Sequence, residues 1–149
     1  MAQTIYVLNG PNLNLLGQRQ PEIYGRATLA DVEKLCRATA KRHGIRIEFR
    51  QSNHEGVIID SIQEARAKRA AGLIINPGGL TTTSISILDA LLTLDAPVIE
   101  VHVTNIHSRE EFRRNSYVSL AARAVAAGFG IQGYALAITG LASMINAKE

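Results

Sequence analysis

The fold is indicated by residues 73–79, whose sequence is Leu-Ile-Ile-Asn-Pro-Gly-Gly. A short, continuous apolar run that ends in such a turn is typical of a strand buried on both faces. Residues 4–8, Thr-Ile-Tyr-Val-Leu, form a second run of this kind, and it ends at Asn-Gly-Pro. Residues 97–103 form a third. These runs predict the strands of a buried sheet.

Helical patterns fill the intervals between these runs. Thr28 and Asp31 fit a capping box for a helix that ends near Gly44. We predict two more capping boxes, at residues 52–55 and 108–111, and further helices over 84–94 and around 138–145. Alternating apolar and charged residues over 45–50 predict a half-exposed edge strand, and residues 124–127 suggest a fifth strand.

This alternation of strands and helices predicts the fold class. Apolar strands separated by helices favour a parallel sheet with helices on both faces. An edge position for the second strand fits the flavodoxin-like order 2-1-3-4-5. We therefore expect residues 1–149 to form a single flavodoxin-like α/β domain with a five-stranded parallel sheet.

Composition limits the class of function. The 149 residues carry 16 basic and 13 acidic side chains, and a net charge of +3 is too small for a nucleic-acid-binding surface. One cysteine, Cys36, excludes an internal disulfide and is compatible with a reducing compartment. No apolar run approaches the roughly 18 residues of a membrane span, and the first residues do not resemble a signal peptide. We expect a cytoplasmic protein with neither nucleic-acid nor membrane partners.

The strand order also predicts where a ligand binds. In doubly wound sheets the ligand lies beyond the carboxyl ends of the strands, where the order reverses. Residues 9–14, 76–84 and 102–109 should therefore face one crevice. The first connection, residues 9–27, is longer than the ~12–15 residues usual for a plain loop. Because it carries Arg19 and Tyr24, it is either a lid over a ligand or a packed surface loop.

Two titratable residues lie at the end of the fourth predicted strand. Glu100 and His102 are two positions apart and so point to the same face. A carboxylate can fix the tautomer of an imidazole and favour its protonated form, as a general acid requires. A surface ion pair is the alternative, and the position at the ligand-binding end of the sheet favours the acid.

Other polar groups near this end leave alternatives open. The glycine turn and hydroxyls of residues 76–84 suit an anion or a sugar-like ligand, or they serve only to cap a helix. Arg109, Arg113 and Arg114 either pair with a carboxylate or are solvated. Residues 128–133 match the dinucleotide pattern G-x-G-x-x-G but lack a following strand, so we interpret them as a turn into the last helix. We assign His54 to a helix start, and no Cys/His spacing predicts a metal site.

Several ordered segments together resemble type II 3-dehydroquinate dehydratases along essentially the whole chain. The matching segments are residues 8–14 (LNGPNLN), 19–25 (RQPEIYG), 51–56 (QSNHEG), 76–79 (NPGG), 100–102 (EVH), 109–113 (REEFR) and 130–134 (GIQGY). The resemblance implies an enzyme that removes water from 3-dehydroquinate, a cyclic carboxylate, to give 3-dehydroshikimate. It implies anti elimination through an enolate, without metal or cofactor, in either aromatic biosynthesis or quinate breakdown. It also implies a homo-dodecamer built from trimers.

The resemblance also assigns roles to residues. Tyr24 is the implied base, acting as tyrosinate, and Arg19 the cation that a base of this kind requires, since a tyrosine in water has a pKa of about 10. Asn12 holds the water at the ketone oxygen, and His102, supported by Glu100, is the acid. The implied substrate-binding residues are Asn76, Thr82, Asp89, Val103, Thr104 and Arg113, with Asp89 acting across the trimer interface.

One position departs from the family pattern. At the positions of residues 81–84, which follow the Asn-Pro-Gly-Gly turn, the family sequence is usually Thr-His-Thr-Ser. This chain has Thr82 in place of the histidine. Loss of one hydrogen bond costs about 0.5–1.5 kcal/mol, or about 3 with a charged partner, which predicts a several-fold to hundred-fold weaker enzyme. An alternative is a weakened paralogue that binds a quinate-like carboxylate as a sensor or assembly partner. A third hypothesis is a flavodoxin-like protein that binds FMN or another nucleotide at residues 81–84.

Overall fold

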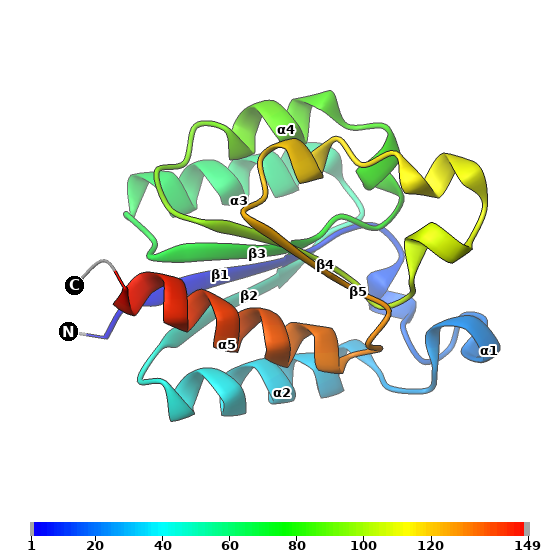
Figure 1. The fold of residues 1–149 in the computed structure, drawn as a ribbon, viewed down its shortest axis with the longest axis horizontal. Helices are drawn as coiled ribbons and strands as arrows, with labels where there is room; N and C mark the ends of the chain where they lie inside the picture. The colour runs from blue at the N-terminus through cyan, green and yellow to red at the C-terminus, as the bar shows by residue number, and fades with distance from the viewer. Residues whose placement is uncertain (1, 148–149) are drawn as a thin grey trace.

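The computed structural model, which describes residues 2–147, has one parallel five-stranded sheet (Figure 1). Its strands are β1 (Thr4–Asn9), β2 (Arg46–Gln51), β3 (Gly72–Asn76), β4 (Val98–His102) and β5 (Ala124–Ala127). They lie in the order β2-β1-β3-β4-β5, and every neighbouring pair is parallel. The predicted fold class and strand order are confirmed, including the edge position of β2.

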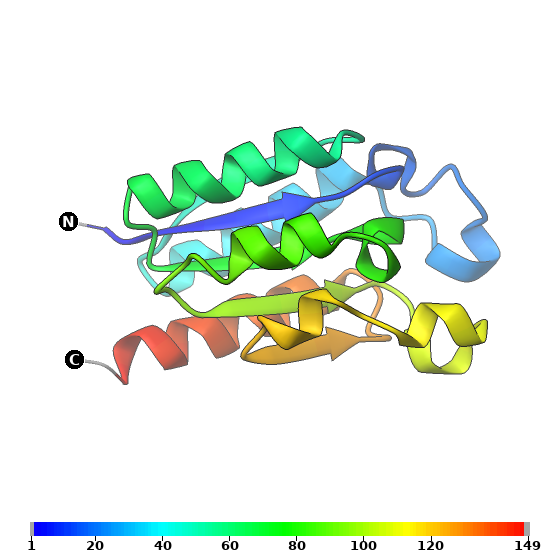
Figure 2. The ribbon, with the colours of Figure 1, turned by 90° about the horizontal axis from the view of Figure 1, so that it is seen from above.

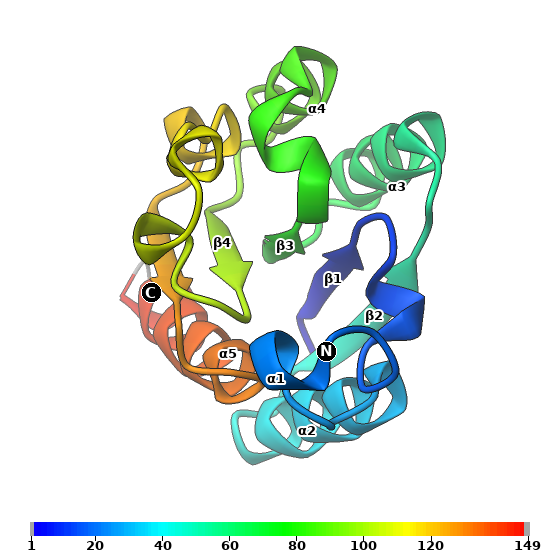
Figure 3. The ribbon, with the colours of Figure 1, turned by 90° about the vertical axis from the view of Figure 1, so that its right-hand side faces the viewer.

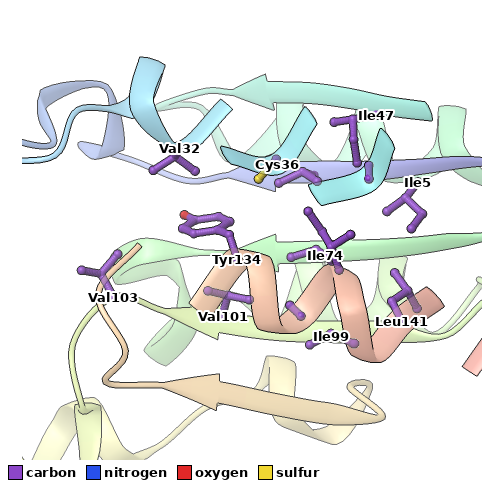
Figure 4. Close-up of a cluster of buried hydrophobic side chains, with 14 of the residues drawn as sticks. Ile5, Val32, Cys36, Ile47, Ile74, Ile99, Val101, Val103, Tyr134 and Leu141 are labelled. Atoms are coloured by element: carbon purple, nitrogen blue, oxygen red, sulfur yellow. The ribbon is translucent and has the colours of Figure 1, made fainter. Parts of the chain in front are cut away.

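Helices cover both faces of the sheet, as predicted. Helices α2 (Leu29–Arg42) and α5 (Gln132–Asn146) lie on one face, and α3 (Glu55–Ala67) and α4 (Ile85–Leu91) lie on the other (Figures 1 and 3). Because successive strand residues point to opposite faces, Ile5 and Val7 join the core under α2 and α5, while Tyr6 and Leu8 join the core under α3 and α4. Figure 4 shows Tyr134 of α5 within the first core.

Only the first of the three predicted capping boxes is correct. The Thr28 hydroxyl accepts from the Asp31 N–H, and the Asp31 carboxylate accepts from the Thr28 N–H. At 52–55 the box is wrong, because the Ser52 hydroxyl accepts from the N–H of His54 and the helix begins only at Glu55. At 108–111 it is also wrong: the short helix there begins at 111, and no side chain caps it.

Short helical segments gather at the carboxyl end of the sheet. The long first connection contains η1 (Leu13–Leu15) and the four-residue helix α1 (Pro21–Tyr24), and β3 is followed by η2 (Gly78–Thr82). After β4 come η3 (Ile106–Ser108), η4 (Glu111–Arg114) and η5 (Val118–Leu120). Figure 2 shows α1 and the yellow segments that contain η3 and η4 at the end of the molecule away from both termini, whereas η5 packs against α4. The sheet therefore presents loops from three strands at one end.

The turns after β1 and β3 lie directly against each other. The Gly10 N–H donates to the carbonyl of Asn76 at 2.8 Å. A Cβ added to Gly10 would lie 2.3 Å from the carbonyl oxygen of Pro77, so only glycine permits this approach. The two turns form a common floor from which polar side chains project. In residues 2–147, no helix combines the length and the apolar character needed to span a membrane.

Candidate active site

A cavity of about 170 Å³ lies at the carboxyl end of the sheet, where sequence reasoning placed the ligand. It is bounded by the first connection, the turn after β3 and the segments after β4. The predicted site residues that line it are Asn12, Arg19, Tyr24, Asn76, Thr82, His102, Val103, Thr104 and Arg113. A larger hollow of about 560 Å³ lies at the opposite end of the strands, and none of the predicted site residues line it. The chemistry belongs to the smaller cavity.

Tyr24 enters the cavity from the last position of α1. Proline occupies the first position of this helix, and Gly25 ends it with a φ of 79°, which places Tyr24 at a sharp change of chain direction. The guanidinium carbon of Arg19 lies 5.0 Å from the centre of the Tyr24 ring, and that of Arg109 lies 5.2 Å from it. Arg19 was predicted to be near Tyr24, whereas the Arg109 contact was not.

The imidazole of His102 hydrogen-bonds through Nε2 to Oε2 of Glu100, and both side chains are buried. Glu100 also accepts from the hydroxyls of Ser116, at 2.8 Å, and Ser119, at 2.5 Å. Burial by itself raises the pKa of Glu100, but the hydrogen bonds from His102 and the two serines outweigh burial and hold the pKa below its usual value. A charged carboxylate therefore stands behind the imidazole and leaves Nδ1 as the ring nitrogen that is free for a ligand.

Asn76 is held by a buried chain of hydrogen bonds. Its Nδ2 donates to the Tyr134 hydroxyl at 2.9 Å, and that hydroxyl donates to Oδ1 of Asn9 at 2.7 Å. The Asn76 Oδ1 accepts from the N–H of Gly78 at 3.2 Å. Burial raises the pKa of Tyr134, so its hydroxyl stays protonated. Because an amide nitrogen carries two hydrogens, one N–H of Asn76 remains for a ligand in the cavity.

Asn12 begins the first connection in a left-handed conformation, with a φ of 71°. Asparagine tolerates this region better than most residues. Its backbone N–H donates to Oδ1 of Asn53 at 2.9 Å, a contact that ties the first connection to the loop after β2. The Asn12 amide is exposed and lies at the cavity, where a ligand or water can reach it.

Two arginines of the segment after β4 line the cavity. Arg109 donates from Nη1 to the Thr104 hydroxyl at 3.2 Å, and Arg113 donates from Nε to the exposed carboxylate of Glu110 at 2.7 Å. The terminal nitrogens of Arg113 stay available to an anion in the cavity. Arg114 is exposed and does not line the cavity, so of the three arginines considered from the sequence only Arg109 and Arg113 reach it.

The hydroxyl-rich segment lies at a helix start, as predicted, but only one of its hydroxyls caps the helix. Thr81 and Thr82 belong to η2, and their hydroxyls donate to the carbonyls of Gly78, at 2.7 Å, and Gly79, at 3.3 Å. Ser84 alone caps α4, accepting from the N–H of Ile87 at 3.0 Å. Thr81 and Thr82 line the cavity, but each has used its hydroxyl hydrogen locally.

The chain does not bring Asp89 to the cavity. Asp89 lies on α4, is exposed and is absent from the cavity wall. The predicted role of Asp89 was in a neighbouring subunit's site, so its position in the single chain neither supports nor opposes that role. Residues 2–147 bring together no group of three His, Cys, Asp or Glu side chains of the kind that binds metals.

Comparison with known proteins places this geometry in context. Residues 3–142 match the family model described as dehydroquinase class II. The chain is 62% identical to a 3-dehydroquinate dehydratase of Rhodopseudomonas palustris over 148 residues, which are 99% of this chain and 98% of the relative. The crystal structure of type II dehydroquinase from Propionibacterium acnes superposes with a TM-score of 0.92 at 42% identity, over 96% of this chain and 98% of that one. A 3-dehydroquinate dehydratase-like protein from Bifidobacterium longum, 24% identical with a TM-score of 0.74 over 98% of this chain and 99% of that one, shares the fold.

Proposed function

The chain belongs to the class II dehydroquinase family, and we propose that it is a hydro-lyase that dehydrates 3-dehydroquinate to 3-dehydroshikimate. The observation that carries the proposal is the pairing, at one cavity, of a phenol beside two guanidinium groups with an imidazole backed by a carboxylate. Elimination of water beside a ketone requires both a base and an acid. The cavity offers one candidate for each.

We propose Tyr24, as tyrosinate, for the base. The guanidinium carbons of Arg19 and Arg109 lie 5.0 and 5.2 Å from the centre of its ring, so two cations are close to the proposed base. The tyrosinate removes the proton beside the ketone, and the electron pair left behind forms the enolate. A water held by Asn12 donates a hydrogen bond to the enolate oxygen, where negative charge develops.

His102 is the proposed acid. Since Nε2 is engaged by Glu100, the proton comes from Nδ1. When the enolate electron pair re-forms the ketone, the bond to the departing hydroxyl breaks, and the His102 proton converts that hydroxyl into water. Tyr24 then holds one proton more and His102 one fewer, and exchange with solvent restores both.

The remaining polar groups suit the other substituents of the substrate. Arg113, with the Val103 backbone and the Thr104 hydroxyl, is placed to bind the carboxylate. The free N–H of Asn76 suits a ring hydroxyl. Thr82 offers a hydroxyl only as an acceptor, because its hydrogen is directed to Gly79. The site therefore makes a weaker contact at this position than a histidine would, and we keep the expected several-fold to hundred-fold loss in rate.

We also propose a dodecamer built from trimers, in which Asp89 of one subunit completes the site of the next. The support for an interface at this face of α4 comes from the neighbouring Ile85 and Leu92, which are 53% and 60% exposed. Light scattering should give about twelve times the 16.1 kDa chain mass, and a monomer would contradict the assembly. Cytoplasmic location and the choice between biosynthesis and quinate breakdown stay predictions.

The activity is tested by following the ultraviolet absorbance of the conjugated enone formed from 3-dehydroquinate. The variant Tyr24→Phe should lose turnover and keep its melting temperature. Tyr117→Phe, outside the cavity lining, is the matched control and should retain activity. No absorbance change with pure protein, and none with Thr82→His, would overturn the proposed function. Tight calorimetric binding of quinate without turnover would instead favour the sensor.

A further inference from the structure

We infer that Ser119 is a positioning residue for the acid, and that its hydroxyl, with that of Ser116, fixes the buried Glu100 carboxylate behind His102. The inference rests on the proposed function, because Ser119 acts through His102 and does not line the cavity. The motif segments that carry the family resemblance contain neither serine.

The two oxygens of Glu100 have different partners. Oε2 accepts from His102 and, at 2.8 Å, from Ser116, whereas Oε1 accepts from the Ser119 hydroxyl at 2.5 Å. Because Glu100 has no exposed surface, water does not replace a lost partner. The Ser119 bond therefore opposes rotation of the carboxylate and keeps Oε2 directed at the imidazole.

The orientation of Ser119 itself supports a role. Ser119 is an exposed residue at the middle of η5, and an exposed hydroxyl is readily satisfied by solvent. Its side chain instead reaches inward to a carboxylate 19 positions earlier in the chain. Ser116 is less informative, because its hydroxyl also accepts from the Ser119 N–H at 3.1 Å and so helps to order the turn. Replacing Ser119 therefore removes a hydrogen bond to Glu100 and leaves the contact that the Ser116 hydroxyl makes within the turn.

The electrostatic consequence follows from what faces His102. On the cavity side, the charged and titratable groups in the lining are Arg19, Tyr24, Arg109 and Arg113. Behind the ring, the Glu100 carboxylate is hydrogen-bonded to Nε2. Without the Ser119 bond, a buried oxygen of Glu100 has no partner, and the negative charge on that group becomes less favourable. The carboxylate is then free to turn, and His102 is less well oriented as an acid.

The test compares Ser119→Ala with Ser119→Thr, which keeps the hydroxyl, and with Ser143→Ala, an exposed serine substitution on α5. We expect kcat of Ser119→Ala to fall about tenfold, equivalent to about 1.4 kcal/mol, with KM within about twofold of wild type. Ser119→Thr should recover most of kcat, and Ser143→Ala should match wild type. In nitrogen-15 NMR spectra recorded at one pH, the His102 ring signals of Ser119→Ala should differ from those of wild type, while the ring signals of the other three histidines stay unchanged.

Unchanged kcat in Ser119→Ala, unchanged His102 ring signals, or a Ser119→Thr enzyme as slow as the alanine variant would each overturn the inference. The NMR measurement needs no substrate. If wild-type protein proves inactive on 3-dehydroquinate, the proposed function fails, and the His102 ring signals still decide whether Ser119 orients the Glu100–His102 pair.

Discussion

Tyr134→Phe removes one oxygen atom from the centre of the molecule and should cost about 2–4 kcal/mol in the free energy of unfolding. The Tyr134 hydroxyl has no exposed surface, donates to Asn9 at 2.7 Å and accepts from Asn76 at 2.9 Å. Each buried polar group left without its partner costs about 1–3 kcal/mol. Asn9 loses the donor to its Oδ1, and Asn76 loses the acceptor for one N–H.

Thermal unfolding at fixed protein concentration measures this cost. With about 3 °C per kcal/mol for a chain of this length, the melting temperature should fall by roughly 6–12 °C. The freed Asn76 amide should also raise KM several-fold. Tyr117→Phe removes a hydroxyl from a residue outside this network and serves as the control. A Tyr134→Phe melting temperature within about 1 °C of wild type would refute the reasoning, because the two amides would then have found other partners.

Three further outcomes are expected. Arg109→Ala should lower kcat about ten- to hundredfold, because one of the two cations beside Tyr24 is lost; a kcat equal to wild type in the absorbance assay would contradict this. The Glu100 pKa is lower in the folded than in the unfolded chain, so the stabilisation from this group is present above the ordinary value of 4.5 and is lost as pH falls below it. The free energy of unfolding of Glu100→Gln, measured in urea, should therefore fall less between about pH 5 and pH 3 than that of wild type. An equal fall in the two proteins would count against this prediction. Gly10→Ala should destabilise the fold by more than about 2 kcal/mol in urea unfolding, because the added carbon would lie 2.3 Å from a carbonyl oxygen of Pro77; near-neutral stability would show that the turn moves freely.

The sheet could be predicted from the sequence because the signals that specify it are local. Each strand is a short apolar run, and the alternation over residues 45–50 marks the edge. The Thr28 capping box succeeds because both its partners lie within one turn. The predicted box at 52–55 is wrong because the Ser52 hydroxyl accepts from the His54 N–H in the turn before the helix. The residue types at 52–55 are the same for either contact, so the sequence does not distinguish them.

The site could be predicted only where strand ends or family motifs mark it. The strand order brings the segments around Asn12, Asn76 and His102 to one end of the sheet. The contact of Arg109 with Tyr24 joins residues 85 positions apart, and no local pattern signals it. The same holds for Ser119, whose inward hydroxyl is fixed by the path of the chain after β4 rather than by its neighbours in sequence.

The bond between Tyr134 and Asn9 spans 125 positions and has a consequence for synthesis on the ribosome. Asn9 is translated before Tyr134, which belongs to α5, the last element of the described chain. Until α5 emerges, the amides at the ends of β1 and β3 lack the hydroxyl that joins them. A nascent chain can therefore pair its early strands but acquires an ordered pocket only after α5 has been made, so that catalytic competence follows the synthesis of this helix.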